Sequence, residues 1–251
     1  MAVRLIIHTD SIKQSDVNTF KSAANTLLGE YRSRFPADRV ERLFVRSGRE
    51  IVAGINGLKG GVLASLDVVS HGNQGGVHIA RRLNVPVKSS FLQEQAHYGI
   101  RRYSDRPQTR KDAEYCEESI HGLYTDWAAR KLVAYYYNQA GGDGTDVAYL
   151  HEIAYDRFQP GAHVELHGCL TAEMLPFVNT YLKDNFAKQL SDNLPKGCTV
   201  VGHTDRSNPN LVPSSRISDY RHGPVRVYRD GAIVQESIQR EELRFPNSST
   251  P

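Results

Sequence analysis

The 251-residue sequence has only three cysteines, two methionines and one tryptophan, and it has no long apolar run. Since a membrane-spanning helix needs about 18 consecutive apolar residues, no transmembrane segment is predicted. The cysteines Cys116, Cys169 and Cys198 form no C-x-x-C pair, so neither a disulfide framework nor a cysteine-rich zinc site is expected. We therefore expect the chain to be made and folded in a reducing compartment.

Positive and negative charges are also nearly balanced. Lysine and arginine number 31 against 28 aspartates and glutamates, which gives a net charge of +3. This balance is too small to indicate a nucleic-acid partner. The composition is that of an ordinary globular protein, with 39% hydrophobic and 24% charged residues. With no internal repeat, we predict one domain over 1–251, with an irregular insertion at about 73–144.

Several familiar nucleotide and phosphate motifs are missing. The chain has no Gly-Lys-Ser/Thr, and the glycine-rich segment 72–76 lacks the G-x-G-x-x-G spacing, although it follows a predicted strand. No arginine stands at the sixth position after any cysteine, which excludes a cysteine-phosphatase loop. A phosphate-binding α/β protein is therefore only a weak alternative.

Hydrophobic periodicity predicts alternating strands and helices at both ends of the chain. An apolar stripe from Val17 to Phe35 predicts a helix that Pro36 ends, and Ser47 with Glu50 has the form of a capping box, in which Glu50 reaches back to the Ser47 amide. A later helix is predicted from apolar residues at every fourth position over 174–190. The predicted strands are 4–8, 40–45, 63–69, 162–166 and 199–202, and a hairpin at 225–228 and 232–235 that turns at Asp230-Gly231. The residues 1–8 thus belong to a first strand and not to a signal peptide.

This alternation predicts an α/β fold with a central, mostly parallel sheet, helices on both faces and a C-terminal β-hairpin. In such sheets ligands bind beyond the carboxyl ends of the strands. Two predicted strands bring reactive side chains to that edge, since 63–69 leads to His71 and 162–166 leads to Cys169. A thiol beside an imidazole forms a nucleophile with a proton-transfer partner. The pair His71 and Cys169 therefore predicts nucleophilic catalysis.

Two motifs carry a family resemblance: Leu-Asp-Val-Val-Ser-His-Gly at 66–72 and Val-Glu-Leu-His-Gly-Cys-Leu-Thr at 164–171. With the helix after Cys169 and the strand 198–203, they resemble the caspase-like cysteine peptidases, which include caspases, legumain, clostripain, gingipains and the self-cleaving domains of bacterial toxins. The resemblance implies a caspase-like three-layer sandwich and a cysteine endopeptidase. It implies Cys169 as nucleophile, His71 as donor of a proton to the leaving amine, and the N–H groups of Gly72 and Cys169 as an oxyanion hole.

The resemblance also implies sites for substrate and activator. The segment after 199–202 forms the specificity pocket in this family, so Asp205 would suit a basic substrate residue and Arg206 an acidic one. Toxin-type members are activated by inositol hexakisphosphate near the terminal hairpin, and arginine binds phosphate well. The corresponding residues of this chain are Arg216, Arg221, Arg226 and Arg229. The implied partner is a protein or peptide substrate, no cofactor is required for the chemistry, and delivery into host cells as a bacterial effector follows by analogy.

Other interpretations stay open from the residues alone. His163, Glu165, His167 and Cys169 alternate along one strand and would face the same side, which allows a zinc site, although no metal is our prediction. A caspase-like module that has lost its activity is the main non-enzymatic alternative. Ser70 or Asp67 would orient His71, and His203 is the reserve base because it also follows a strand.

Overall fold

The computed structural model describes residues 1–11, 13–79, 121–126, 128–130, 147–174, 184–205 and 223–237. Within these ranges no helix combines the length and the apolar character needed to cross a bilayer. The described part of the chain leaves out Cys116, Arg206, Arg216 and Arg221. Residues 175–183 of the predicted helix at 174–190 also lie outside it.

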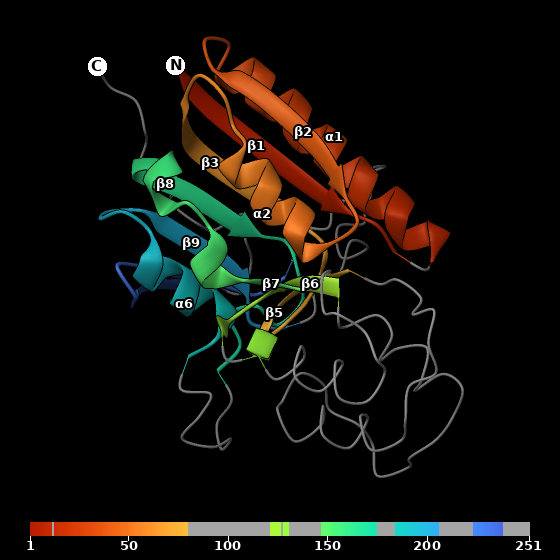
Figure 1. Cartoon of the computed structure of the whole chain (residues 1–251), viewed down its shortest axis with the longest axis vertical. Coiled ribbons are helices and arrows are strands. Elements are labelled where there is room, and N and C mark those ends of the chain that lie inside the picture. The colour runs from red at the N-terminus through yellow and green to blue at the C-terminus, as the bar shows by residue number, and fades with distance from the viewer. Residues whose placement is uncertain are drawn as a thin grey trace.

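A seven-stranded central sheet organises the fold (Figure 1). Five parallel strands are followed at one edge by an antiparallel pair, so the predicted α/β class with a mostly parallel sheet is confirmed. The order across the sheet is β11 (Ala232–Ser237), β10 (Val225–Arg229), β9 (Thr199–His203), β8 (Phe158–Leu166), β3 (Val62–Val69), β1 (Ala2–Thr9) and β2 (Arg39–Val45).

The edge pair β10 and β11 is the predicted C-terminal hairpin. Asp230 and Gly231 form its turn with φ angles of 50° and 73°. This left-handed conformation at both positions matches the right-handed twist of the flanking strands, and Asp-Gly is a preferred sequence for it. The Asp230 carboxylate also accepts a hydrogen bond from the Gly197 amide at 2.8 Å, which ties the turn to the segment before β9.

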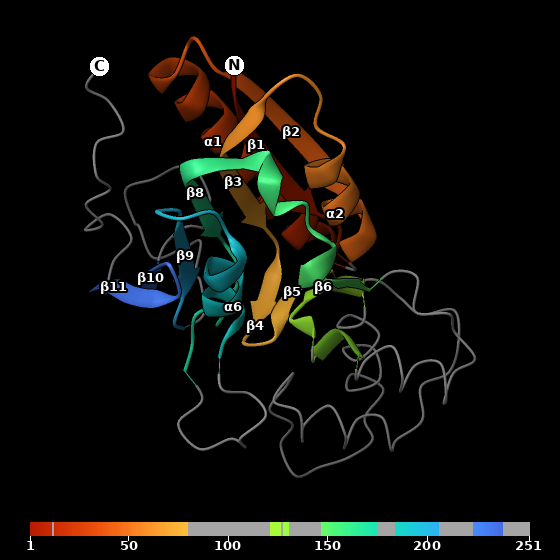
Figure 2. The same cartoon turned by 60° about the vertical axis from the view of Figure 1, so that its left-hand side comes forward.

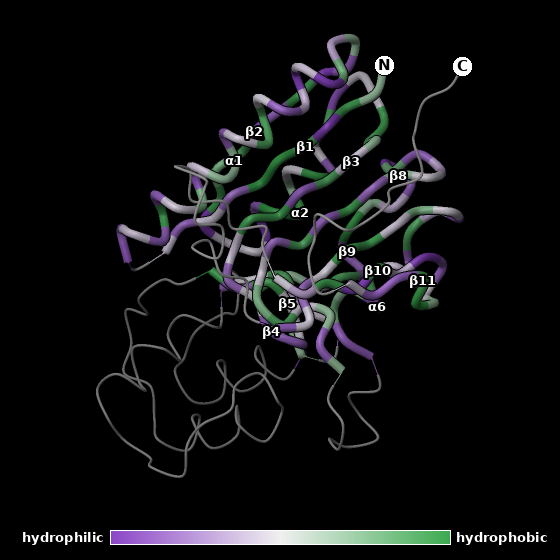
Figure 3. The backbone as a smooth tube through the Cα atoms, turned by 180° about the vertical axis from the view of Figure 1, so that it is seen from behind, coloured by the Kyte–Doolittle hydropathy of each residue, from purple (hydrophilic) through white to green (hydrophobic). Residues whose placement is uncertain are grey.

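Helices cover both faces of the sheet because alternate side chains of β1 point to opposite sides. Ile6 packs in one apolar cluster with Phe20 and Leu27 of α1 (Gln14–Arg34). Leu5 and Ile7 belong to the larger cluster on the other face, together with buried residues of α2 (Gly48–Asn56) and α6 (Phe186–Asn193). Viewed from behind, α1 shows the mixed hydrophilic and hydrophobic colouring of a helix with one buried face (Figure 3).

The start of α2 follows its sequence signal with one difference. Ser47 is the N-cap residue, and its hydroxyl accepts a hydrogen bond from the Glu50 amide at 3.2 Å. The reciprocal bond of the predicted capping box is shifted by one residue, since the Glu50 carboxylate accepts from the Arg46 amide at 2.7 Å and not from Ser47. The helix ends at Asn56 with Gly57 as C-cap.

A second, four-stranded sheet lies beyond the carboxyl end of β3 (Figure 2). Its order is β4 (His71–Asn73), β5 (Gly76–Ile79), β6 (His121–Tyr124) and β7 (Ala148–Tyr149), and the short 3-10 helices Leu150–Glu152 and Tyr155–Arg157 lead from β7 to β8. The sequence analysis did not predict this sheet. The segment 72–76, considered there as a phosphate loop, is the turn between β4 and β5, closed by a hydrogen bond from the Gly75 amide to the Asn73 side chain at 2.8 Å.

Candidate active site

The two motifs meet at the carboxyl ends of neighbouring parallel strands. β3 and β8 pair directly, and the His167 amide continues the pairing with a 2.9 Å bond to the Val68 carbonyl. Beyond this point two glycines touch through their backbones. A Cβ placed on Gly168 would lie 3.1 Å from the Gly72 Cα, and one placed on Gly72 would lie 2.8 Å from the Cys169 carbonyl oxygen. The structure therefore brings the segments carrying His71 and Cys169 side by side.

The loop that carries Cys169 is anchored to the end of β9. The Leu170 amide donates to the Asp205 carbonyl at 3.1 Å, and the Ala172 amide donates to the His203 carbonyl at 2.9 Å. Between them, the buried Thr171 hydroxyl donates to the Gly168 carbonyl and accepts from the His203 amide, each at 3.2 Å. These bonds join the predicted pocket segment after β9 to the predicted nucleophile loop.

Leu170, directly after Cys169, has a left-handed backbone with φ of 61°. This conformation costs an L-residue with a side chain about 1–2 kcal/mol, so the surrounding contacts must hold it. Backbone strain of this kind gathers at active sites and ligand clamps. The strained residue Leu170 directly follows Cys169, whose side chain is partly exposed, whereas Cys198 is buried.

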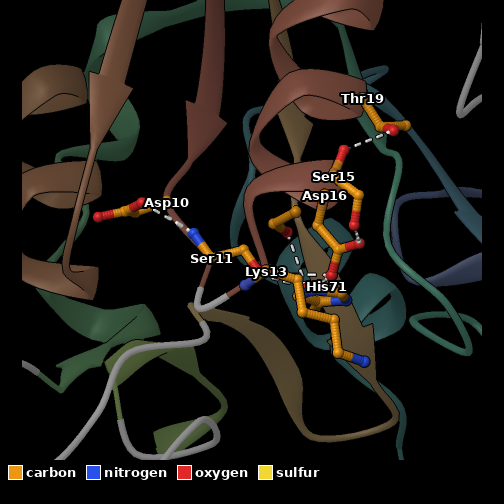
Figure 4. A network of polar contacts seen from close by, with 8 residues as sticks. Asp10, Ser11, Lys13, Ser15, Asp16, Thr19 and His71 are labelled. Carbon is orange, nitrogen blue, oxygen red and sulfur yellow. Dashed lines mark hydrogen bonds and ion pairs between the residues drawn. The ribbon is translucent and has the colours of Figure 1, made fainter.

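The His71 ring is held on several sides by residues of α1 and of the strand β5. Its Nε2 lies 3.1 Å from an Asp16 carboxylate oxygen and 3.5 Å from the Ser11 hydroxyl (Figure 4). Phe20 presents its ring at 78° with centroids 5.1 Å apart, and His78 stacks at 5.5 Å. The His71 and Asp16 side chains are 26% and 28% exposed, so solvent reaches this pair.

Asp16 is therefore the residue that orients His71, and the two predicted candidates are wrong. The Ser70 hydroxyl donates to the His71 carbonyl oxygen, away from the ring, at 2.8 Å. Asp67 bonds His167, directly after β8, and Tyr31, and no bond joins it to the His71 ring in the described contacts. Sequence reasoning missed Asp16 because it stands in the first turn of α1, where an acidic residue is commonplace.

The electrostatics of the pair favour an ionised carboxylate. The hydrogen bond from His71 is the main cause that lowers the pKa of the Asp16 carboxyl, and partial burial opposes it. Lys13 and Ser11 lower this pKa further. A carboxylate that remains charged at neutral pH can hold the imidazole ring in one orientation.

Of the predicted specificity and activator residues, Asp205, Arg226 and Arg229 lie in the described part of the chain. Asp205 is exposed at the end of β9, next to Leu170, whereas its counterpart Arg206 lies outside the described residues. On β10, the Arg226 guanidinium donates to the Ala172 carbonyl at 2.8 Å and pairs with Glu236. A phosphate bound by Arg226 would therefore have to compete with Glu236. Arg229 lies at the other end of β10, paired with Thr199 at the start of β9, so the structure does not bring it together with Arg226.

Two further candidates are placed by the structure. His203 lies on β9 with 1% of its surface exposed, which leaves this reserve base without access to a substrate. The zinc set drawn from one strand, with Cys169 as a ligand, is not formed. Among the described residues, the group with metal-binding geometry is instead Asp67, Glu165 and His167, from two strands.

Comparisons of the chain with protein-family models, with curated proteins and with solved structures found no match. An assignment of function must therefore start from the site itself. The arrangement that this site offers is a partly exposed thiol and an imidazole on adjoining segments, with a carboxylate on the imidazole.

Proposed function

We propose that this protein is a cysteine peptidase of the caspase-like type, which cleaves peptide bonds through Cys169 and His71. The observation that carries the proposal is the backbone contact between Gly72 and Gly168 at the carboxyl ends of β3 and β8. It brings the imidazole-bearing and thiol-bearing segments to one rim, where ligands bind in open α/β sheets. The Asp16 carboxylate, 3.1 Å from His71, supports a catalytic role for that ring.

The proposed reaction proceeds by acyl transfer. The Cys169 thiolate attacks the carbonyl carbon of the scissile bond, a C–S bond forms, and the carbonyl electron pair moves to oxygen. The N–H groups of Gly72 and Cys169 are the proposed donors to this oxyanion, and such a donor contributes roughly 3 kcal/mol. His71 then protonates the leaving amine as the C–N bond breaks. Water hydrolyses the thioester, which returns the thiol and releases the acid.

Asp16 is the proposed positioning residue in this scheme. When Nε2–H of His71 donates to the carboxylate, the other ring nitrogen is left to exchange the proton with Cys169 and the amine. Phe20 and His78 restrict rotation of the same ring. Of the groups that contact this ring, Asp16 is the one that also selects its tautomer.

The substitution Asp16→Asn is expected to lower kcat about tenfold and to leave KM within about twofold, because the amide keeps the size of the side chain but not its charge. Steady-state kinetics on a cleaved peptide measure both constants. Asp10→Asn is the matched control, since Asp10 is a nearby carboxylate that bonds the Ser11 amide and not His71. Equal kcat values for the wild type and Asp16→Asn would remove Asp16 from the mechanism.

The reactivity of the thiols tests the proposed function directly. A peptidyl electrophile should modify Cys169 at least about 100-fold faster than Cys198, because burial raises the pKa of the Cys198 thiol. Peptide mapping by mass spectrometry after timed labelling gives both rates. The exposed Asp205 favours a basic residue in the electrophile, so arginyl and aspartyl reagents should be compared. Similar slow labelling of both cysteines by every reagent would indicate an inactive module.

A further inference from the structure

A buried group of ionisable side chains lies between the sheet and α1, at the ends of β3 and β8 that lead to His71 and Cys169. Asp67 on β3 pairs in register with Glu165 on β8, and His167 follows two residues later on the same face. Asp67 and His167 are fully buried, and Glu165 is 1% exposed. Charged groups are rarely buried without a compensating partner, so this group needs an explanation.

The geometry of the group is that of a compact set of metal donors. His167 Nε2 lies 2.9 Å from Asp67 Oδ1, and its Nδ1 lies 3.9 Å from Glu165 Oε1. One donor atom from each of the three side chains lies within 4.8 Å of the other two. The His167 Nδ1 atom, although fully buried, has no hydrogen-bond partner in the described part of the chain. The unpartnered nitrogen thus faces a carboxylate at a distance too long for a hydrogen bond.

The charge balance of the group also favours a bound divalent cation. Two buried carboxylates with one imidazolium carry a net charge of −1, whereas two carboxylates with a neutral imidazole and a divalent cation carry none. Tyr31 of α1 is a further neighbour, and its hydroxyl donates to Asp67 Oδ2 at 2.7 Å. A hydrogen bond of this kind orients a ligating carboxylate. Two further basic side chains lie close by: Arg4, over the Tyr31 ring, is paired with Asp38 at 2.8 Å, and His163 lies 3.7 Å from Glu165.

We propose that Asp67, Glu165 and His167 bind a structural Zn²⁺ ion between β3, β8 and α1. Carboxylate oxygen with imidazole nitrogen is a donor set that suits zinc, whereas magnesium and calcium prefer oxygen alone. Bonds of about 2.0–2.2 Å place donors roughly 3–4 Å apart, and one ion takes one of the two His167 ring nitrogens. The widest of the present separations, up to 4.8 Å, therefore has to close by roughly 1 Å when the ion binds. His163, 22% exposed and 3.7 Å from Glu165, marks the side from which an ion reaches the site. The proposal does not depend on the peptidase function.

Zinc binding to the full-length chain tests the proposal. After removal of metal with a chelator, the wild type should bind one Zn²⁺ per chain in equilibrium dialysis. At a hundredfold excess over Kd, zinc should raise Tm by about 5 °C or more. Co²⁺ in place of zinc should give the visible absorption of a tetrahedral or five-coordinate ion. Absence of both stoichiometric binding and a Tm shift in the wild type overturns the proposal.

Variants separate this site from weak surface binding. Glu165→Gln keeps the shape of the side chain and His167→Gln approximately its size, and both variants should lose the Zn²⁺-induced Tm shift. The matched control is His151→Gln, which removes an exposed histidine 3.0 Å from Asp126 and should keep the full shift. A full shift in a folded Glu165→Gln variant contradicts the proposal. If both cluster variants fail to fold, the stoichiometry and Co²⁺ spectrum of the wild type decide.

Discussion

Replacement of Cys169 by alanine is expected to abolish peptide cleavage, with a loss of at least about 1000-fold in kcat/KM. The nucleophile is removed, and no other described thiol can replace it because Cys198 is buried and donates to the Gln159 carbonyl. The free energy of unfolding should change by less than about 1 kcal/mol, since the Cys169 side chain is partly exposed. Incubation with a peptide library and mass spectrometry of the products measures the activity.

The control for this prediction is Cys198→Ala, which should keep the cleavage pattern of the wild type. His71→Ala should also lose activity, but its ring packs on Phe20 and His78, so this variant loses stability as well. Cys169→Ala is therefore the cleaner test. Undiminished cleavage by Cys169→Ala would show that the thiol is not the nucleophile, and the peptidase proposal would fall with it.

Acidification from pH 7 to pH 4 is expected to remove about 3 kcal/mol of stability through His8 alone. Burial, assisted by Arg42 and Lys21, lowers the pKa of His8 from 6.5 to about 4. Between these values the unfolded chain binds a proton that the folded chain does not bind, so the free energy of unfolding decreases as the pH falls. Above about pH 6.5 this contribution is fully present, and below about pH 4 it is lost.

The substitution His8→Leu isolates this effect, because leucine keeps an apolar side chain beside Phe44 and does not titrate. Urea unfolding at several pH values should show that the variant loses about 3 kcal/mol less than the wild type across the window. Asp16 does not confuse the result, since its lowered pKa affects stability only below its usual value of 3.8. If the free energy of unfolding decreases equally with falling pH in the two proteins, the His8 ring is in a solvated environment and the prediction is wrong.

The central sheet could be predicted because each of its elements has a local signal. Alternation of apolar residues defines β1, β3 and α1, and Asp230-Gly231 defines the hairpin turn. The second sheet escaped prediction because its strands have two to four residues each, and β6 pairs with β5 and β7 across long stretches of chain. Strands of this length are too short to show a hydrophobic periodicity. Their strand conformation depends on the segments with which they pair.

The candidate site was predictable in part for the same reason. His71 and Cys169 follow strong strand signals, and parallel strands end at one edge, so their meeting could be anticipated. The contact of Asp16 with His71 joins residues 55 positions apart and depends on how α1 crosses the sheet. The buried group of Asp67, Glu165 and His167 likewise depends on the register of β3 against β8. Sequence patterns describe a strand well but not its partner or alignment.

The contact of Gly72 with Gly168 has a consequence for control of the proposed enzyme. Main-chain atoms in van der Waals contact set the spacing of the two reactive segments, and no side-chain rearrangement is needed to create it. For the proposed peptidase, this spacing exists as soon as the chain folds, so restraint would have to come from blocking approach to the rim or from keeping targets elsewhere. Alanine at either glycine is expected to push the two segments apart and so to lower the proposed activity, although neither substitution removes a reactive atom.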